Sequence, residues 1–233
     1  MRTYRLVLVE PEGKINMGFI LRLCKNFSVE DICVVNPQFD IRDEEVIEFS
    51  AKANDFVEKV KVARSLQECL KGVKIVVCTT AKARKETDLL RQSVPPQVLH
   101  SLLPSTGVTA LVFGRESVGL KRSELRECDI VSTLETGAEY NVLNLSHAVA
   151  IYLYELRRAE TSYSAGVYEE CSDRSLKSLR RVLRELEALT GDVRGVQALK
   201  NVIFRSGPRK PECGALYKFL KKLKYRLMKE GAH

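Results

Sequence analysis

The stretch VFGRESVGLKRSEL, residues 112–125, joins a short apolar run to a polar segment through a turn that contains two glycines. The apolar run ends at Phe113, as a buried strand would. Gly114 and Gly119 permit a tight loop, and the residues after Gly119 favour a helix. A strand, a glycine turn and a helix in this order form the repeating unit of an α/β fold.

The same loop resembles a phosphate-binding loop only in part. A P-loop needs Lys and then Ser or Thr directly after its second glycine, but Leu120 follows Gly119 here. A G-x-G-x-x-G pattern is also missing, so an ATPase and a nicotinamide enzyme are both disfavoured. Arg115 and Glu116 stand side by side where the strand ends, and a charged pair at a ligand-facing turn commonly fixes a polar ligand. We therefore interpret this loop as part of a functional site.

Apolar, β-branched runs recur from the N-terminus to about residue 159. They are YRLVLV (4–9), DICVVN (31–36), KIVVCT (74–79), TALVFG (109–114) and DIVST (129–133), with helix-like stretches at 16–27, 65–72 and 95–103. Strands this short and continuously apolar are typical of a parallel sheet covered by helices on both faces. Residues 1–159 are therefore predicted to form an α/β domain. Its ligand should bind at the carboxyl ends of the strands.

The last quarter of the chain has a different character. Residues 160–172 are mostly small and polar and are predicted to be a linker, and amphipathic helices are expected at 173–190, 192–207 and 213–230. Residues 173–233 carry 16 Lys and Arg against 6 Asp and Glu, a net charge of +10, whereas the whole chain has +8. The remainder is therefore at −2. This small basic helical domain predicts a polyanionic partner.

Cysteine and histidine usage limits the chemistry. The seven cysteines contain no C-x-x-C pair and there are only three histidines, so neither a zinc site nor a disulfide framework follows from the spacing. No run approaches the roughly 18 apolar residues of a membrane span. The apolar run that ends at Glu10 does not look like a signal peptide. We expect a reduced, cytoplasmic protein with no metal and no membrane contact.

Two further stretches stand out. In EGKINMGFILRLCKNF, residues 12–27, Asn16 is expected to cap a helix, Gly18 to allow a close backbone approach, and Arg22 to lie on that helix. In EYNVLNLSHAVAIYLYEL, residues 139–156, Asn141 and Asn144 precede an apolar helix. An N-cap explains one of these two amides but not both.

Taken together, NMGFILR, LVFGRESVGL and EYNVLNLSHAV, in this order and at these intervals, resemble the three motifs of the SPOUT superfamily of RNA methyltransferases. The similarity is closest to its TrmJ branch of tRNA 2′-O-methyltransferases. The tail sequence VIFRSGPRKPECGALYKFLKKL resembles the helical C-terminal extension of that branch. The resemblance thus covers nearly the whole chain.

The resemblance implies a deep trefoil knot in the α/β domain, a fold that is rare among proteins. It also implies a homodimer that shares its active site across the interface, with the apolar helix 145–156 as the dimer surface. S-adenosylmethionine would be bound in the knot. The cofactor-binding residues carried over by motif position are Thr79, Thr80, Ala81, Gly114, Leu134, Asn141, Val142 and Leu143.

The activity implied is methylation of a ribose 2′-OH in the tRNA anticodon loop, at nucleotide 32, on cytidine, with uridine left open. The catalytic residues carried over are Asn16, Arg22, Glu116 and Asn144. Family proposals make Arg22 the base, but a guanidinium is effectively never deprotonated in a protein. We expect Arg22 to orient a phosphate or to stabilise the developing alkoxide, while the proton leaves through water.

Positively charged side chains are expected to contact the RNA phosphates. They are Arg205, Arg209, Lys210, Lys218, Lys221, Lys222 and Lys224 in the tail, and Lys14, Arg84 and Arg115 near the cofactor loops. Two alternatives stay open, a ribosomal RNA 2′-O-methyltransferase and a non-catalytic RNA-binding knotted dimer. Val142 slightly favours the second, because related enzymes often carry serine there and no mechanism that uses that hydroxyl can operate in this chain.

Overall fold

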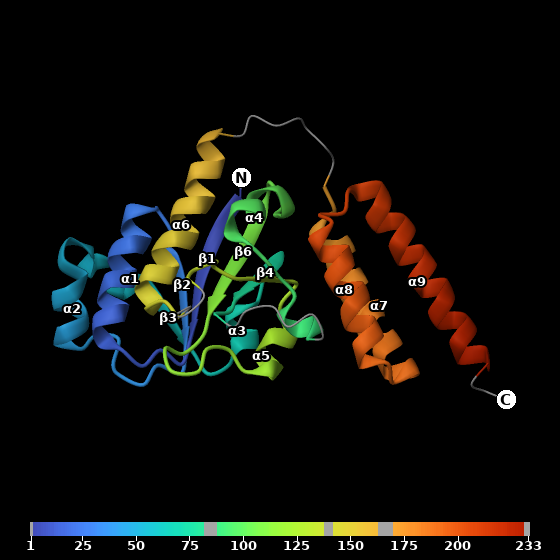
Figure 1. The fold of residues 1–233 in the computed structure, drawn as a ribbon, viewed down its shortest axis with the longest axis horizontal. Coiled ribbons are helices and arrows are strands. Elements are labelled where there is room, and N and C mark those ends of the chain that lie inside the picture. Colours follow the sequence, from blue (N-terminus) through green and yellow to red (C-terminus); the bar gives the residue numbers. More distant parts are fainter. Residues whose placement is uncertain (1, 82–87, 138–141, 163–169, 231–233) are drawn as a thin grey trace. The chain divides into compact units, whose positions relative to one another are not determined.

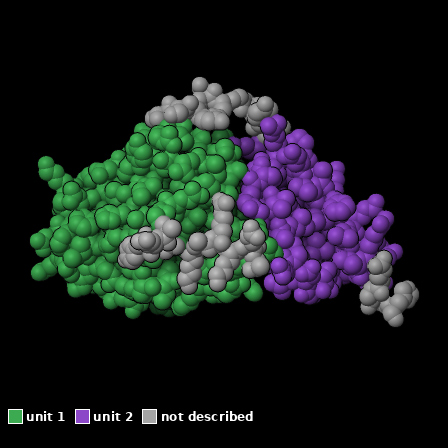
Figure 2. Space-filling view, in the orientation of Figure 1, with its two compact units in different colours: residues 1–163 green, residues 164–233 purple. Residues whose placement is uncertain are grey.

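The computed structural model describes residues 2–81, 88–137, 142–162 and 170–230. The chain divides into two compact units, residues 1–163 and residues 164–233, which Figure 2 colours separately. Helix α6 (Leu145–Ser162) runs three residues into the segment predicted to be a linker. Residues 163–169 of that segment lie outside the described residues.

The first unit is built on a parallel sheet, which confirms the predicted fold class. Within the described residues its strands are β1 (Arg2–Val9), β2 (Asp31–Val35), β3 (Val60–Ala63), β4 (Ile75–Thr79), β5 (Ser93–Val94), β6 (Gly107–Phe113) and β7 (Ile130–Ser132). They lie in the order β3-β2-β1-β6-β4-β7-β5, and every neighbouring pair is parallel. Strands β3 and β5 were not predicted. β3 lies at the sheet edge with only Ala63 buried, so it has no continuous buried apolar run, and β5 has only two residues.

Helices cover both faces of this sheet (Figure 1). They are α1 (Lys14–Asn26), α2 (Glu44–Ser50), the 3₁₀ helix η1 (Ala51–Lys59), α3 (Leu66–Cys69), the 3₁₀ turn η2 (Leu89–Arg91), α4 (Pro96–Leu102), α5 (Arg122–Arg126) and α6. On one face, Val7, Val112 and Val76 pack with Leu66 of α3 and Leu125 of α5. On the other face, α6 places Tyr152 with its ring 5.5 Å from that of Phe113. Helix α1 lies beside α6 and contacts it.

The close backbone approach predicted at Gly18 is confirmed. Gly18 lies on α1 and faces the backbone of α2. A Cβ atom there would lie 2.6 Å from the Cβ of Phe49 and 2.9 Å from the carbonyl oxygen of Val46. The glycine therefore lets two helices pack more closely than any side chain would allow.

Cysteine pairing contradicts the expectation that the chain has no disulfide framework. The structure contains the disulfides Cys33–Cys69, Cys78–Cys128 and Cys171–Cys213, and Cys24 is a buried free thiol. The partners are 36, 50 and 42 residues apart in sequence, so no local spacing motif could reveal them. They meet only because the fold brings separate elements together.

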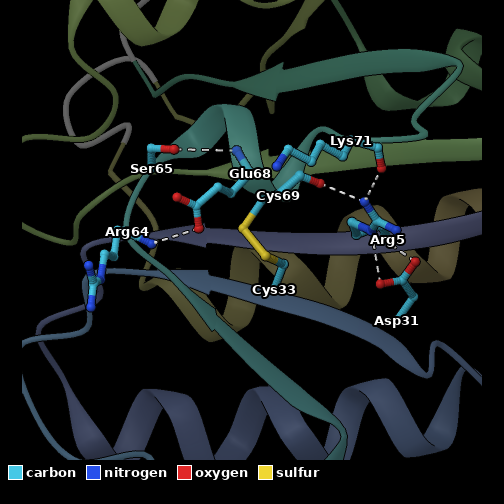
Figure 3. Close-up of a disulfide and its surroundings, with 8 residues drawn as sticks. All are labelled: Arg5, Asp31, Cys33, Arg64, Ser65, Glu68, Cys69 and Lys71. Atoms are coloured by element: carbon cyan, nitrogen blue, oxygen red, sulfur yellow. Dashed lines mark hydrogen bonds and ion pairs between the residues drawn. A yellow bond between two sulfur atoms is a disulfide. The ribbon is translucent and has the colours of Figure 1, made fainter.

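The Cys33–Cys69 disulfide joins β2 to the end of α3, as Figure 3 shows. Beside it, the guanidinium of Arg5 donates to the carboxylate of Asp31 at 2.8 Å and to the carbonyl oxygens of Cys69 at 2.6 Å and Lys71 at 2.9 Å. These carbonyls lie at the end of α3, where the helix itself supplies no donors. The disulfide and the arginine thus fix the same helix terminus to the sheet.

The second unit contains three helices in its described part: α7 (Asp173–Thr190), α8 (Val193–Arg205) and α9 (Lys210–Glu230). The prediction of a helix at 173–190 is confirmed at both ends, with Ser172 as the N-cap and Gly191 in the left-handed conformation as the C-cap. Helix α7 packs against both α8 and α9. The Cys171–Cys213 disulfide connects the segment before α7 to the first turns of α9.

Among the described residues, none of the helices is both long enough and apolar enough to cross a membrane.

Candidate active site at the carboxyl ends of the strands

The order of the strands brings three of the predicted loops to one edge of the sheet. Strand β4 lies between β6 and β7, and all three are parallel. β4 therefore ends, at Thr79, beside two other strand ends. Ser132 is the last residue of β7 and pairs with Thr79, and Gly114 directly follows β6. The carboxyl ends of neighbouring parallel strands are the usual place for a ligand in an α/β fold.

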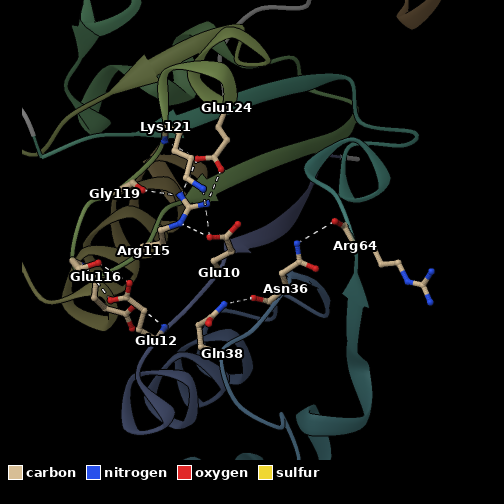
Figure 4. A network of polar contacts seen from close by, with 11 residues as sticks. Glu10, Glu12, Asn36, Gln38, Arg64, Arg115, Glu116, Gly119, Lys121 and Glu124 are labelled. Carbon is tan, nitrogen blue, oxygen red and sulfur yellow. Dashed lines mark hydrogen bonds and ion pairs between the residues drawn. The ribbon is translucent and has the colours of Figure 1, made fainter.

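Glu116 is the centre of a set of hydrogen bonds that joins the loop after β1 to the loop after β6. Its carboxylate accepts hydrogen bonds from the backbone N–H groups of Glu12 at 2.9 Å and Gly13 at 3.1 Å. In return the carboxylate of Glu12 accepts from the hydroxyl of Ser117 at 2.6 Å and its backbone N–H at 3.2 Å. Figure 4 shows Glu12 and Glu116 facing each other across the two loops. We call these reciprocal contacts the Glu12–Glu116 clasp.

Two asparagines extend the clasp to the third motif. The side-chain amide of Asn16 donates to Glu116 at 3.0 Å, and the amide of Asn144 donates to the side-chain oxygen of Asn16 at 2.8 Å. The side-chain oxygen of Asn144 accepts from the backbone N–H of Ser146 at 2.8 Å and from its hydroxyl at 2.7 Å. Asn144 therefore fixes the start of α6 while reaching toward α1. Side chains from three segments meet here, and Asn16 is 100 residues from Glu116 and 128 from Asn144 in sequence.

The role predicted for Asn16 needs one correction. Helix α1 begins at Lys14 and its N-cap is Gly13, which makes no side-chain capping bond. Asn16 is already inside the first turn, so its amide is directed to Glu116 instead of to the helix terminus. The sequence pattern placed the start of the helix too late.

The expectation that Arg115 contacts RNA is also corrected, because its guanidinium is buried. It donates to Glu10 at 2.6 Å, to Glu124 at 2.8 Å and 3.0 Å, and to the carbonyl oxygen of Gly119 at 3.1 Å (Figure 4). Its side chain is only 5% exposed. A guanidinium so fully engaged is a structural anchor for the loop that follows β6.

The electrostatics around Arg115 follow from this geometry. The hydrogen bond from Arg115 holds the pKa of Glu10 below its ordinary value. Burial would raise the pKa of Glu124, but hydrogen bonds from Arg115 and from the backbone N–H of Lys121 lower it overall. Both carboxylates therefore remain charged at neutral pH and keep the arginine in place.

Gly114 has a strict steric role in the same loop. A Cβ atom at this position would overlap the backbone of Gly119 and Leu120, which folds back against it. Arg115 and Gly119 pair across the loop, and Gly119 adopts a positive φ of 70°. Only glycine at position 114 allows the loop to close this tightly after β6.

Arg22 is exposed, whereas Arg115 is buried. It lies on the exposed surface of α1, where Ile15 and Phe19 precede it at helical spacing and are 40% and 37% exposed. Within the described residues, no hydrogen bond or ion pair of its guanidinium is found. The structure does not bring Arg22 into the hydrogen-bonded set around Glu116, and its predicted role depends on what binds to this surface of α1.

Apart from Gly114, the predicted cofactor residues lie in three segments. Thr79 and Thr80 are half-buried and Ala81 is exposed at the end of β4. The hydroxyl of Thr79 donates to the carbonyl oxygen of Val112 at 3.2 Å, and the carbonyl oxygen of Thr80 accepts from the hydroxyl of Thr133 at 2.7 Å. Leu134 is half-buried after β7, and Leu143 is half-buried while Val142 is exposed before α6. Asn141 lies outside the described residues.

The predicted RNA contacts also differ in exposure. Arg209, Lys210, Lys218, Lys221 and Lys222 are exposed on the second unit, and Arg205 is half-buried. Lys224 forms an ion pair with Glu185 of α7 at 2.9 Å, and Lys14 forms one with Asp43 at 2.8 Å. Arg84 lies outside the described residues.

Sequence reasoning missed the carboxylates that support this site. Glu10, Glu12 and Glu124 hold the two loops together, and Ser117 completes the clasp. The available signal was the pair of acids around Pro11, since two carboxylates directly after a buried strand need cationic or N–H partners. Those partners come from a loop a hundred residues later, which the pattern could not indicate.

This fold and this set of loops define the class of protein. The SpoU rRNA Methylase family matches residues 3–154, and the chain belongs to that family. The match runs from Thr3 in β1 to Tyr154 in α6 and includes the three motif segments. The resemblance inferred from those motifs is thereby confirmed.

Particular relatives cover nearly the full length. The chain is 38% identical over 232 residues to the tRNA (cytidine-2′-O-)-methyltransferase TrmJ of Sulfolobus acidocaldarius, covering 98% of this chain and 96% of the relative. It is 30% identical to the tRNA (cytidine/uridine-2′-O-)-methyltransferase TrmJ of Salmonella typhimurium, with 93% and 94% covered. The crystal structure of TrmJ from Z. mobilis ZM4 is similar in fold, with a TM-score of 0.68, 19% identity, and 95% and 99% covered.

Proposed function

We propose that the protein is an S-adenosylmethionine-dependent methyltransferase that modifies a ribose 2′-OH of tRNA, with cytidine as the base. The archaeal relative that carries this name in its description spans almost the whole chain. Uridine is a second base to test, since the Salmonella typhimurium relative is named for both. The anticodon loop, and nucleotide 32 within it, is proposed from the motif resemblance alone.

The observation that carries the proposal is the meeting of Asn16, Glu116 and Asn144. Each belongs to a different motif, and hydrogen bonds of 3.0 Å and 2.8 Å connect them at the carboxyl edge of the sheet. The adjacent segments suit S-adenosylmethionine, which has an aromatic base with apolar faces and a polar amino-acid end. Leu134 and Leu143 supply half-buried apolar side chains, while the ends of β4 and β6 supply polar backbone groups.

The side chains of this chain would act by positioning. When bound, S-adenosylmethionine supplies a methyl group activated by its sulfonium. The ribose hydroxyl must be held in line with that group, so the loops must keep a fixed spacing. The Glu12–Glu116 clasp and Asn144 provide it. Arg22 would stabilise the developing alkoxide or hold a neighbouring phosphate, since a guanidinium keeps its proton.

A homodimer is part of the proposal and is supported by an exposed apolar surface. Ile15 and Phe19 on α1, and Ile151 and Tyr154 on α6, are 37–55% exposed, and the two helices contact each other. Arg22 lies on the same face of α1 as Ile15 and Phe19. A second copy that covered this surface would place Arg22 at the interface, where an active site shared between subunits needs it.

The knot and the compartment are also part of the proposal. A trefoil knot is inferred from family membership and from the central position of β6 and β4 in the sheet. A tRNA substrate would place the protein in the cytoplasm. Disulfides are rare there, but intracellular proteins of hyperthermophiles are rich in them.

The proposal is tested by calorimetric titration of the purified chain with S-adenosylmethionine, followed by methylation assays on tRNA and ribosomal RNA transcripts. We expect saturable binding near one cofactor per chain and methyl incorporation at the 2′-OH of tRNA cytidine. ATP with magnesium serves as the control ligand and should not bind. Light scattering on the same sample should give twice the chain mass of 26.3 kDa.

Each outcome has a defined meaning. Methylation of ribosomal RNA but not of tRNA would replace the substrate class and keep the chemistry. A folded dimer that binds RNA but no cofactor would establish the non-catalytic alternative, and the proposal would be wrong.

Replacing Glu116 with alanine should lower the turnover of methylation on the order of 10²-fold, because misplacing reacting groups by about 1 Å costs that much. Three N–H donors lose their acceptor, and the loops after β1 and β6 lose their spacing. Glu116→Gln should lose less turnover, since its carboxamide oxygen still accepts hydrogen bonds from these N–H groups. The matched control is Val118→Ala, a 62% exposed neighbour in the same loop that is not part of the clasp, and it should keep activity within about twofold. Equal losses in the two alanine variants, measured as initial rates at saturating tRNA, would contradict a positioning role for Glu116.

A further inference from the structure

One face of helix α9 packs inside the second unit. Cys213 and Leu220 are buried, Leu216 and Leu227 are half-buried, and Lys224 is half-buried in its ion pair with Glu185. These residues recur at three- and four-residue intervals, so they form one stripe along the helix. The stripe packs against α7. The apolar residues on this face are fully explained by the helical unit itself.

The opposite face carries two exposed aromatic rings. Phe219 is 64% exposed and Tyr225 is 60% exposed. At roughly 100° per residue, Lys218, Lys222, Arg226 and Lys229 fall in the angular range between these two rings. The ammonium of Lys229 lies 4.9 Å from the centre of the Tyr225 ring. We call these six residues the aromatic–basic face of α9.

The charge of this face is of one sign. The only acidic residues of α9 are Glu212 in its first turn and Glu230 at its end, and none occurs between them. The core of a surface that binds another protein is usually depleted of charged residues, lysine among them. Four cations between two exposed rings match a strand that has a phosphate and an aromatic base in every unit.

We propose that the aromatic–basic face of α9 binds unpaired nucleotides of the RNA substrate, with bases stacked on Phe219 and Tyr225 and phosphates held by the four cations. This rests on the proposed function and adds to it the part of the RNA that the helical unit recognises. A base inside a duplex has no free face for a side-chain ring, whereas bases in loops and at ends do. The face therefore selects single-stranded elements of a folded RNA, and Lys224 takes no part in it.

The test compares two double variants of the full chain, Phe219→Ala/Tyr225→Ala and Lys218→Ala/Lys222→Ala. Binding is measured without S-adenosylmethionine, by fluorescence anisotropy, to a single-stranded oligouridylate and to a duplex RNA of the same length, over a series of salt concentrations. Loss of the rings should weaken binding to the single strand at least about fivefold per ring, with an unchanged salt dependence. Loss of the lysines should weaken binding to both RNAs and reduce the slope of log affinity against log salt.

Several outcomes would overturn the proposal. One is an unchanged affinity of the aromatic variant for the single strand, and another is an equal loss of its affinity for single strand and duplex. A third is a loss of binding to vesicles of anionic lipid, measured in parallel, with no loss of binding to RNA. A fall in molecular mass of the aromatic variant would instead assign the face to a second copy of the chain. Both rings are exposed, so the thermal unfolding of the variant should match the original. Since no cofactor or methyl transfer is involved, a negative result here leaves the methyltransferase assay untouched, and the reverse also holds.

Discussion

Arg22→Ala is expected to reduce tRNA methylation by about 10³-fold or to background, while S-adenosylmethionine binding and thermal stability stay close to those of the original protein. The expected loss is large because a group that stabilises developing negative charge acts only in the transition state. The stability should hold because Arg22 is exposed on α1 and, within the described residues, makes no ion pair that its removal could break. The measurement is a single-turnover methylation rate together with a calorimetric cofactor titration.

The conservative variant and a matched control make this prediction specific. Arg22→Lys should retain part of the rate if the role is purely electrostatic, and almost none if the planar guanidinium must bind a phosphate with two hydrogen bonds. Arg42→Ala removes another exposed arginine of the same unit, one paired with Glu58, and should leave the rate unchanged. An Arg22→Ala protein that methylates tRNA normally would remove Arg22 from the catalytic set.

Reduction of the disulfides should lower the melting temperature of the protein by more than about 10 °C. Each disulfide closes a loop of 36 to 50 residues, which adds about 4 kcal/mol to the free energy of unfolding in the chain-entropy model. Measured values are often somewhat smaller. A domain of this size loses roughly 2–4 °C per kcal/mol. Two of the disulfides lie in the sheet unit, where Cys33, Cys69, Cys78 and Cys128 belong to one hydrophobic cluster. The measurement is calorimetric melting with and without reductant.

Thiol counting separates this prediction from a general effect of the reductant. In denaturant, the untreated protein should show one reactive thiol per chain, that of Cys24, and the reduced protein should show seven. A Cys33→Ala/Cys69→Ala variant should melt lower than the original and respond less to reductant. Seven thiols before any treatment would mean that the disulfides do not form in the purified protein.

Local patterns were sufficient for the elements that are long or fully buried. The strands at β1, β2, β4, β6 and β7 were predicted from short apolar runs, and α7 from its amphipathic pattern. The region of α2 and η1 was missed because its helices are short and their apolar residues are interrupted by charges. Leu189 continues the apolar spacing of α7 but is 45% exposed in the last turn of the helix.

The site shows where a pattern is not enough. Arg115 and Glu116 are adjacent in sequence, yet one is buried against Glu10 and Glu124 while the other accepts from Glu12, Gly13 and Asn16. Adjacency suggested one shared role, but successive residues at the end of a strand face different neighbours. The grouping of Asn16, Glu116 and Asn144 came from the family motifs, since no local periodicity connects positions in three separate segments of the chain.

The place of β1 in the sheet has a consequence for how the protein is made. β1 is synthesised before the other described strands and ends up in the interior of the sheet, where Leu6 pairs in register with Leu111, 105 residues later. At a synthesis rate of about 5–20 residues per second, that partner follows after roughly 5–20 s. During this interval one edge of an apolar strand has no native neighbour, and such an edge invites pairing with other nascent chains. Folding of the sheet should therefore be slow, coupled to completion of the first unit, and helped by chaperones that shield β1.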